Sequence, residues 1–235
     1  LQGTEGREKY KVYGELINTY GYNLEPGSKE LTALNYYTNE EITIPLDPTQ
    51  TPGENAQRYF AKYNKQKRTF EALTELIQET ADDIQYLESI SNALDIALNE
   101  ADLAQIKEEL MQSGYIRRKH TKKKVKLTSK PMHYISSDGY DMYVGKNNLQ
   151  NEELTFSFAN GNDWWFHAKG APGSHVIVKS GGDELPDRTF EEAGRLAAYY
   201  SKNRGADKVE IDYIQKKHVK KPNGAKPGFV VYYTN

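Results

Sequence analysis

Four side chains in one short stretch, Asp163, His167, Ser174 and His175, are of the types that hydrolases use. A serine nucleophile needs a histidine base within hydrogen-bond reach and a carboxylate behind that histidine. Ser174, however, stands between a glycine and an apolar β-type run, not at a strand-to-helix elbow. Asp163 and the two histidines could alternatively bind a metal ion, but their spacing matches no zinc signature. We therefore expect no catalytic residue, no metal ion and no cofactor.

The turn at residues 170–175 is rich in glycine and could present backbone N–H groups to a phosphate. It is not a P-loop, because it lacks the Gly-Lys-Ser/Thr ending and continues into a β-branched run. A plain hairpin turn is the alternative. The phosphate interpretation is favoured by seven lysines, namely Lys146, Lys169, Lys216, Lys217, Lys220, Lys221 and Lys226. Together with the rings of Trp164, Trp165 and His167 they suit RNA, whose backbone needs cations and whose exposed bases stack.

Charge is divided unevenly along the 235 residues, although the net charge is only −2. Residues 1–113 carry 10 Lys/Arg against 20 Asp/Glu, and residues 114–235 carry 21 against 13, so the halves are −10 and +8. This asymmetry favours two units with different partners, the second suited to phosphate or an acidic surface. The 37% hydrophobic content supports a buried core, and no apolar run is long enough to span a membrane. The absence of cysteine fits a reducing cytoplasm.

The elements that would hold these residues begin with a helix over residues 5–20 and a small hairpin. Strands are predicted at residues 31–37 and 41–46, on either side of a turn at Thr38, Asn39 and Glu40. A long helix follows from Gly53 to Asn99 with few breakers, and a short one covers residues 101–112. These parts make a first region, residues 1–113, with a hairpin tip unit at about residues 21–52.

The long helix carries a coiled-coil seam at Phe70, Leu73, Ile77, Thr80, Ile84, Leu87 and Leu94. An apolar stripe of this length needs a partner along all of it, and the helix at residues 5–20 is too short to supply one. Two partners remain open. Either the chain associates with a second copy, or an upstream helix of the same coiled coil is absent, and the abrupt start favours the second.

The second half reads as an α+β unit with several antiparallel strands. The run from Arg117 to Lys130 is basic and contains no acid. It predicts a linker or a strand over residues 114–130. Strands are predicted at residues 134–135, 140–144, 154–158, 164–167, 176–179, 209–214 and 229–233. A helix begins at a capping box formed by Thr189 and Glu192, and its apolar stripe includes Ala193 and Ala197.

Several motifs in this half together resemble the NFACT-R domain. They are Gly145-Lys146-Asn147-Asn148-Leu149-Gln150-Asn151-Glu152, Asp163-Trp164-Trp165-Phe166-His167-Ala168-Lys169, Pro172-Gly173-Ser174-His175-Val176 and the run from Lys217 to Gly228. The upstream sequences Tyr13-Gly14-Glu15-Leu16 and Asn55-Ala56-Gln57-Arg58-Tyr59-Phe60 resemble the middle coiled-coil region of the same family. Two departures are Lys146, where members commonly have arginine, and Glu152, where aspartate is frequent.

The resemblance implies a fold and a set of site residues. The fold class is α+β: a long helical coiled-coil arm with a small β-hairpin tip unit, followed by an antiparallel-rich NFACT-R domain at residues 131–235. The candidate RNA-binding residues are Lys146, Asn147, Asn148, Trp165, His167, Lys169, Gly173, Ser174, His175, Lys217, Lys220, Lys221 and Lys226. The basic linker adds Arg117, Arg118, Lys122, Lys123 and Lys124.

The resemblance also implies a function, because the NFACT family includes the RqcH/NEMF-type ribosome quality-control factors. These bind a stalled large ribosomal subunit and tRNA and support untemplated C-terminal tailing of the nascent chain, with alanine in bacteria. Peptide-bond formation belongs to the ribosome, so we expect a recruiting factor in the cytoplasm and not an enzyme. The family's N-terminal region, which holds the main tRNA-selecting residues, is absent here.

The alternative function is that of an adhesin. The same family is also described as fibronectin- and fibrinogen-binding proteins that reach the bacterial cell surface without a signal peptide or anchor. In this interpretation host fibronectin is the partner, and it adds a strand at the sheet edge predicted at residues 229–233.

Overall fold

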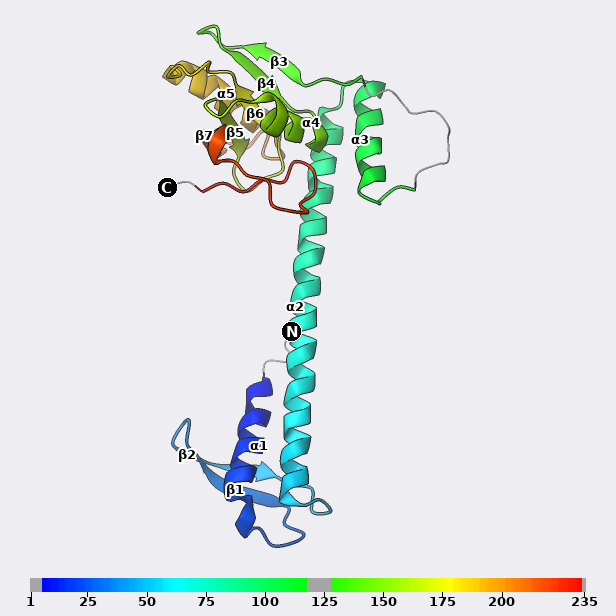
Figure 1. The fold of residues 1–235 in the computed structure, drawn as a ribbon, viewed down its shortest axis with the longest axis vertical. Coiled ribbons are helices and arrows are strands. Elements are labelled where there is room, and N and C mark those ends of the chain that lie inside the picture. The colour runs from blue at the N-terminus through cyan, green and yellow to red at the C-terminus, as the bar shows by residue number, and fades with distance from the viewer. Residues whose placement is uncertain (1–5, 118–127, 234–235) are drawn as a thin grey trace. The chain divides into compact units, whose positions relative to one another are not determined.

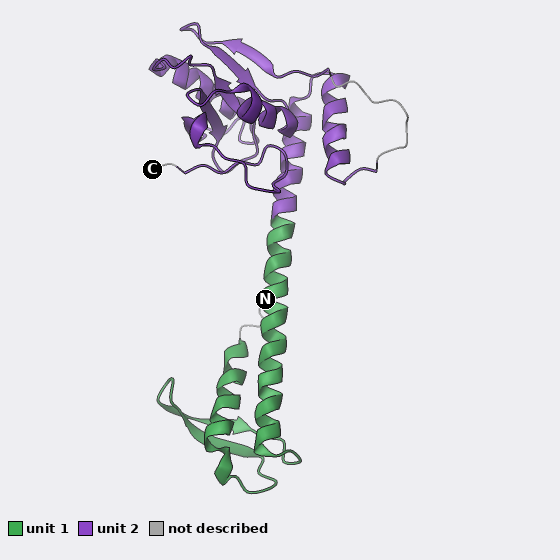
Figure 2. Cartoon of the chain, in the orientation of Figure 1, with its two compact units in different colours: residues 1–81 green, residues 82–235 purple. Residues whose placement is uncertain are grey.

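One long helix, α2 (Pro52–Ile96), contributes to both units into which the chain divides, residues 1–81 and residues 82–235 (Figures 1 and 2). The computed structural model describes residues 6–117 and 128–233. No proline or glycine interrupts the sequence after Gly53 until the helix ends, so its backbone hydrogen bonds continue without a break. The sequence predicted this helix to within a few residues at each end.

The first unit packs the helix α1 (Glu8–Tyr20), followed by the short η2 (Gly21–Asn23), against a hairpin and the start of α2. The hairpin strands are β1 (Glu30–Asn35) and β2 (Glu40–Pro45), paired antiparallel from Glu30 with Pro45 to Asn35 with Glu40. Alternate residues of β1 are buried, so one face of the hairpin covers the core. Leu16, Ile17 and Ile44 form the centre of that core. The helix and the hairpin agree with the sequence prediction, including the turn at Asn39, whose φ is +59°.

Close contact between α1 and α2 is made by aromatic rings. Tyr59 of α2 stacks on Tyr10 at 6.0 Å and meets Tyr13 edge-on at 5.3 Å between ring centroids. Its hydroxyl donates to the carbonyl of Pro45 at 2.5 Å, which ties α2 to the end of β2. Beside these rings, Gly14 of α1 faces Phe60 of α2. A Cβ on Gly14 would lie 2.8 Å from the Phe60 ring, so the glycine lets the two helices approach.

The second unit is built on a five-stranded antiparallel sheet in the order β3-β4-β6-β5-β7. Its strands are β3 (Met132–Ile135), β4 (Asp141–Val144), β5 (Trp164–Ala168), β6 (Val176–Val178) and β7 (Ile211–Gln215). The chain leaves β3 through a turn in which Gly139 has φ +89° and donates its N–H to the carbonyl of Ser136. Glycine adopts this left-handed conformation without strain.

Side chains alternate between the two faces of this sheet, and each face has its own cover (Figure 1). Phe166 and Val176 belong to the face covered by α5 (Asp187–Tyr199). Trp165 and Ile177 belong to the opposite face, which packs against residues of η3 (Leu154–Phe158) and of the C-terminal segment, residues 216–232. The adjacent tryptophans therefore have different surroundings, and Trp165 is fully buried.

A helical layer completes this unit. The C-terminal part of α2 packs against α3 (Glu100–Gln112), with Tyr86, Ile90 and Ile106 buried between them. The predicted seam lies elsewhere on α2: Ile77, Ile84 and other seam residues are exposed, as expected of a stripe that no described residue covers. The residues that α2 buries against α3 therefore lie on a different face of the helix from the predicted seam.

Three local predictions were wrong. Residues 154–158 form no strand, because α4 (Asn148–Glu153) continues into them as the π-helical turn η3. The helix α5 begins at Asp187, not at a capping box: the Thr189 hydroxyl donates to Asp138, and Glu192 accepts from Ser137. Residues 229–233 form no regular strand, since only Val231 pairs with Lys220 in an isolated bridge. The side chains involved have partners distant in the sequence, which local patterns do not reveal.

Substitution of Gly14 by Ala tests the close approach of α1 and α2. Alanine favours a free helix over glycine by about 1 kcal/mol, but here its Cβ meets the Phe60 ring, and overpacking costs roughly 1–3 kcal/mol. We expect G14A to lower the melting temperature of the first unit, followed by far-ultraviolet circular dichroism. Gly53→Ala, with open space around its Cβ, is the matched control and should be neutral or stabilising. An unchanged or raised melting temperature for G14A would contradict the packing.

Candidate nucleic-acid interface

The loop and helix at residues 145–152 hold the sheet against α3 through buried polar side chains. Asn147 caps α4 by accepting from the Gln150 N–H, and both residues also donate side-chain N–H groups to Gln105 of α3, at 2.8 and 2.7 Å. Asn148 donates to Glu109 of α3 and to Ser89 of α2. A Cβ on Gly145 would lie 2.1 Å from the Asn151 side chain, so the turn into this loop requires glycine.

Lys146 makes the strongest contact of this network. Its ammonium lies 2.5 Å from the Asp102 carboxylate of α3, and both side chains are buried. Burial alone would raise the pKa of Asp102, but hydrogen bonds from Lys146 and Ser129 hold that pKa below its ordinary value. The sequence predicts that Lys146, Asn147 and Asn148 contact RNA. The Lys146 and Asn147 side chains instead point into the protein and join the sheet to α3. Asn148 bonds both helices and also lines a cavity beside Trp165.

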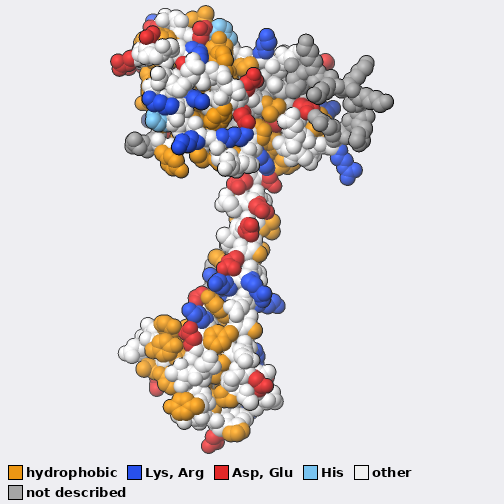
Figure 3. Space-filling model, in the orientation of Figure 1, with side chains coloured by type: hydrophobic (Ala, Val, Ile, Leu, Met, Phe, Trp, Pro, Cys, Tyr) orange, Lys and Arg blue, Asp and Glu red, His pale blue; other side chains and the backbone are white. Residues whose placement is uncertain are grey.

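The other lysines of the candidate site fall into two groups, those with a carboxylate partner and those without one among the described residues. Lys221 is paired with Glu152 at 2.6 Å, Lys169 with Glu210 at 3.4 Å, and Lys226 with Asp83. Lys216, Lys217 and Lys220 have no carboxylate partner within the described residues, and the last two are exposed. Figure 3 shows Lys and Arg side chains on the face of the second unit that carries β7 and the C-terminal segment. The cationic surface is therefore smaller than the lysine count of the sequence suggests.

His167 of β5 and His175, the residue before β6, lie against the Trp165 ring. The Trp165 and His167 rings stack at 5.6 Å, and His175 meets Trp165 edge-on at 5.1 Å. Burial lowers the pKa of His167 to about 4, against smaller opposing effects of the Gly173 backbone and Asp212. Burial and the neighbouring His167 lower the pKa of His175 further. Both imidazoles are thus neutral near pH 7, and neither adds a cation to the site.

The turn that carries Gly173 and Ser174 is fixed by the backbone. The Ser174 N–H donates to the carbonyl of Tyr200, and a Cβ on Gly173 would lie 3.0 Å from the Cβ of Ser201. Ser174 is buried, and its hydroxyl has no hydrogen-bond partner in the part of the chain that the structure describes. This arrangement leaves Gly170, where φ is +64°, at the exposed corner of the turn.

The hydrolase interpretation finds no supporting geometry. Asp163 accepts from Lys179 and from the Ser180 N–H, not from a histidine. His175 is hydrogen-bonded through Nδ1 to Thr155, and the Ser174 hydroxyl makes no hydrogen bond to either imidazole. Within residues 6–117 and 128–233, no cluster of three or more His, Cys, Asp or Glu side chains is arranged to hold a metal ion.

A cavity of about 210 Å³ opens beside Trp165. Its walls come from α2, from the turn at residues 170–173 and from the C-terminal segment, and they include Tyr86, Phe229 and Tyr232. The predicted site residues Asn148, Trp165, His167, Gly173 and His175 all line this cavity. Sequence reasoning missed the contribution of α2, because no local pattern signals that Tyr86 lies next to residues so far along the chain.

Only part of the basic linker lies within the described residues. Arg117 is exposed at the end of the described segment that follows α3. Arg118, Lys122, Lys123 and Lys124 lie outside the described residues, so their contribution remains a prediction.

Fold and surface thus define a two-unit α+β protein whose second unit combines a small cationic face with an aromatic cavity. Comparison with known proteins places it in a family. Residues 1–129 match the family model "NFACT N-terminal and middle domains", and residues 130–233 match "NFACT protein RNA binding domain". The chain therefore belongs to the NFACT family, and its C-terminal part is the family's RNA-binding domain, as the sequence motifs predicted.

Relatives in three bacterial species support this assignment. The chain is similar to the Rqc2 homolog RqcH of Streptococcus pneumoniae, with 45% identity over 99% of this chain and 42% of that protein. The Rqc2 homolog RqcH of Bacillus subtilis is 42% identical over 99% of this chain and 41% of that protein. A solved structure, the C-terminal of the fibronectin/fibrinogen-binding protein from Streptococcus suis, matches with a TM-score of 0.71 and 37% identity, over 99% of this chain and 84% of that one. The chain thus spans less than half the length of these RqcH relatives.

Replacement of Lys146 by Met tests the buried ion pair. Removal of one partner leaves the Asp102 carboxylate buried without its cation, which typically costs roughly 3–5 kcal/mol. We expect K146M to lower the free energy of unfolding by that amount in urea denaturation, and the double variant K146M/D102L to recover part of it. Lys221→Met, which removes a partly exposed ion pair, is the control and should cost about 1 kcal/mol or less. Equal effects of K146M and K221M would contradict this role.

Acid should destabilise the second unit through its histidines. The pKa of His167 is about 4 in the fold and about 6.5 when unfolded, so the unfolded chain binds more protons between these pH values. The free energy of unfolding should be level above pH 6.5 and should fall from pH 6.5 towards pH 4, by up to about 3 kcal/mol from His167. Urea titrations across this range measure the slope. His167→Gln should flatten it, whereas exposed His218→Gln should not.

Proposed function

We propose that the second unit binds RNA of a stalled large ribosomal subunit and its tRNA, in support of untemplated alanine tailing of the nascent chain. The observation that carries this proposal is the exposed face at Lys217 and Lys220, which lack carboxylate partners among the described residues. Lysines that are not neutralised are free to displace the counterions of a phosphate backbone. Membership of a family with an RNA-binding domain and the likeness to RqcH factors support the same partner.

The proposed role is recruitment and not catalysis. The peptidyl transferase centre of the ribosome forms the peptide bonds, so the chain needs no nucleophile or general base of its own. This fits side chains such as Asp163 and His175, whose hydrogen bonds fix the fold. The chain covers 42% of the S. pneumoniae relative, and selection of a particular tRNA is proposed to require parts of such a protein that this chain does not match. The fragment then binds RNA weakly and without preference for one tRNA.

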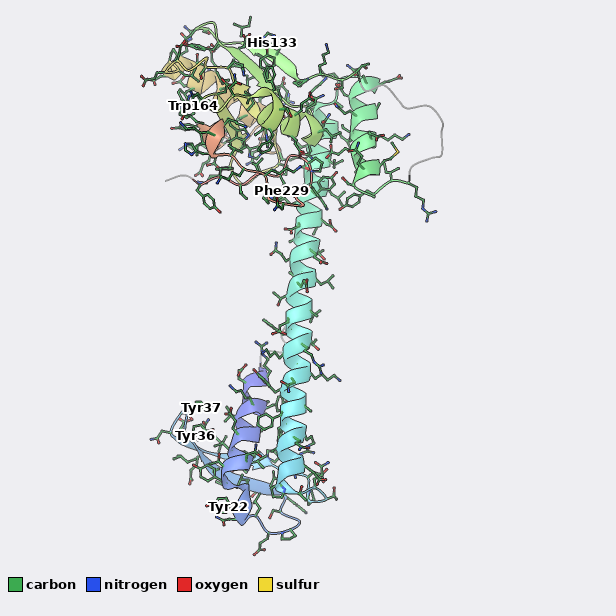
Figure 4. The ribbon with its side chains drawn as sticks, in the orientation of Figure 1. Tyr22, Tyr36, Tyr37, His133, Trp164 and Phe229 are labelled. Atoms are coloured by element: carbon green, nitrogen blue, oxygen red, sulfur yellow. The ribbon has the colours of Figure 1, made fainter. Side chains whose placement is uncertain are left out.

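The hairpin unit is proposed to contact the ribosome. Tyr22, Tyr36 and Tyr37 are exposed on it, with 79% of the Tyr22 surface accessible (Figure 4). Exposed aromatic side chains in a group favour protein or RNA contacts, because they supply large areas with little loss of side-chain entropy. The exposed stripe at Ile77 and Ile84 is proposed to pair with a further helix in a coiled coil, with self-association as the alternative.

Binding of host fibronectin remains the alternative function, motivated by the likeness to the fibronectin/fibrinogen-binding protein of S. suis. The mechanism first expected for it loses support, because residues 229–233 do not offer a regular edge strand. None of the described helices combines the length and the apolar content that a transmembrane crossing requires. A cytoplasmic location is proposed together with the ribosomal role, and a cell-surface location belongs to the adhesin alternative.

Charge reversal at Lys217 and Lys220 tests the RNA-binding proposal. Each phosphate contact that is lost lowers the salt dependence of binding by about one unit of slope. We expect K217E/K220E to weaken binding to purified large subunits by at least about tenfold at low salt, measured by co-sedimentation, and to flatten the salt dependence.

The matched control is R188E/R195E, which makes the same change of net charge on α5, the helix that covers the opposite face of the sheet. It should leave subunit binding nearly unchanged. Equal binding by K217E/K220E and the unsubstituted chain would rule out this face as the RNA contact. Retained binding to immobilised fibronectin that is independent of salt would favour the adhesin alternative.

A further inference from the structure

The cavity beside Trp165 is lined without charge. None of the described residues in its walls is Lys, Arg, Asp or Glu, and the two histidines that line it are neutral near pH 7. A charged group that entered would lose its hydration without gaining a counter-charge, which is unfavourable. The cavity therefore suits a ligand group that is uncharged, although the surface outside it is cationic.

The walls offer flat rings. Trp165 and Tyr232 lie 4.8 Å apart between centroids, and Phe229 stands on the C-terminal segment where that segment passes α2 (Figure 4). Pro172 and Pro227 add rigid apolar surface on either side. Such walls favour a planar aromatic ring system over an aliphatic or branched group. A volume of about 210 Å³ holds one such ring system and is below the usual range of sites for larger ligands.

Polar atoms in the same walls remain available. The Trp165 indole N–H is buried and has no acceptor within the described residues. The Gly173 backbone is hydrogen-bonded to one ring nitrogen of His167, which leaves the other nitrogen of the neutral imidazole as an acceptor. Unpaired donors in a buried site are costly, and a ligand with hydrogen-bonding groups along a planar edge would relieve that cost. Nucleobases combine a planar ring with such an edge.

The C-terminal segment connects the cavity to the cationic face. Lys220 and Val231 exchange two backbone hydrogen bonds, of 2.9 and 2.8 Å, while the neighbours Val230 and Tyr232 line the cavity. Gly228 holds this segment close to α4: its φ is +78°, and a Cβ there would lie 2.9 Å from the Asn148 side chain. A cation that can hold a phosphate thus stands on the same segment that forms the cavity wall.

We propose that this cavity captures one unstacked nucleobase of the bound RNA, while the lysines of the C-terminal segment hold the adjoining phosphates. The proposal rests on the proposed RNA binding and adds a base-binding site to it. Proteins that bind single-stranded RNA commonly combine a stacked base with backbone cations in this way. A free anion, such as a terminal carboxylate, is the occupant that the uncharged walls disfavour.

The test uses the fluorescence of Trp165 and two RNA ligands. Trp164→Phe leaves Trp165 as the single tryptophan of the full chain. Short single-stranded RNA is compared with a ribose-phosphate oligomer of the same length that lacks bases. We expect only the base-containing oligomer to quench Trp165, and to bind about tenfold more tightly, because stacking of a base contributes roughly that factor.

Variants distinguish the contribution of the cavity to RNA binding from that of the cationic face. Ala171→Phe fills the cavity from its partly exposed turn, and Phe229→Ala removes one ring from the wall. Both should abolish the preference for the base-containing oligomer and leave the affinity for the abasic oligomer unchanged. Phe158→Ala, an exposed ring that does not line the cavity, is the control and should keep the preference. K217E/K220E should weaken both oligomers equally.

Each outcome decides between the two proposals. Equal affinity and equal quenching by the two oligomers would overturn the base site while leaving RNA binding intact. Retention of the preference in A171F and F229A would also overturn it, since abasic binding shows that those variants are folded. If neither oligomer binds, the proposed RNA binding fails as well. Quenching by free acetate at similar concentration would identify an anion site instead.

Discussion

The buried contact between Lys146 and Asp102 is the interaction on which the second unit depends. Both charges are removed from water, so each is tolerated only because the other lies 2.5 Å away and further hydrogen bonds complete their coordination. The contact joins the sheet to α3, and Asn148 extends it to α2 through Ser89. Because α2 supplies one wall of the Trp165 cavity, the same network that holds the helices also shapes the site. The same contacts that stabilise this unit therefore also determine the shape of the cavity.

In the rest of the site, the charged side chains and the aromatic surface lie in different places. Lysines that lie near acids are used within the fold: Lys226 contacts Asp83 and lies over the rings of Tyr86 and Tyr115. Lys217 and Lys220, which lack such partners among the described residues, stand exposed on the C-terminal segment. The cavity behind them is uncharged, so a nucleic acid can place phosphate and base in different surroundings. This division explains how a site can bind a polyanion without burying an unpaired charge.

Sequence patterns predicted the elements well where burial follows a regular period. The helices at α1, α2 and α3, the hairpin and most strands of the sheet appear within a few residues of their expected bounds. The prediction failed at residues 154–158, where Leu-Thr-Phe-Ser-Phe alternates as a strand does but continues α4 as a π-helical turn. Thr189 has the spacing of a capping residue, yet its hydroxyl is used by Asp138 and Ser136. In both cases a tertiary contact outweighed a weak local preference.

The site was predictable in its aromatic part and not in its cationic part, for a physical reason. Trp165 and His167 are neighbours on one strand face, and β-geometry alone brings them together. Whether a lysine is free depends instead on acids that arrive from elsewhere, as Asp102 does for Lys146 across 44 positions. A count of lysines therefore overestimates a phosphate-binding surface wherever the fold uses buried ion pairs. For the same reason a motif rich in Lys and Asn can identify a family through the packing it secures, since most of its polar side chains bond within the fold.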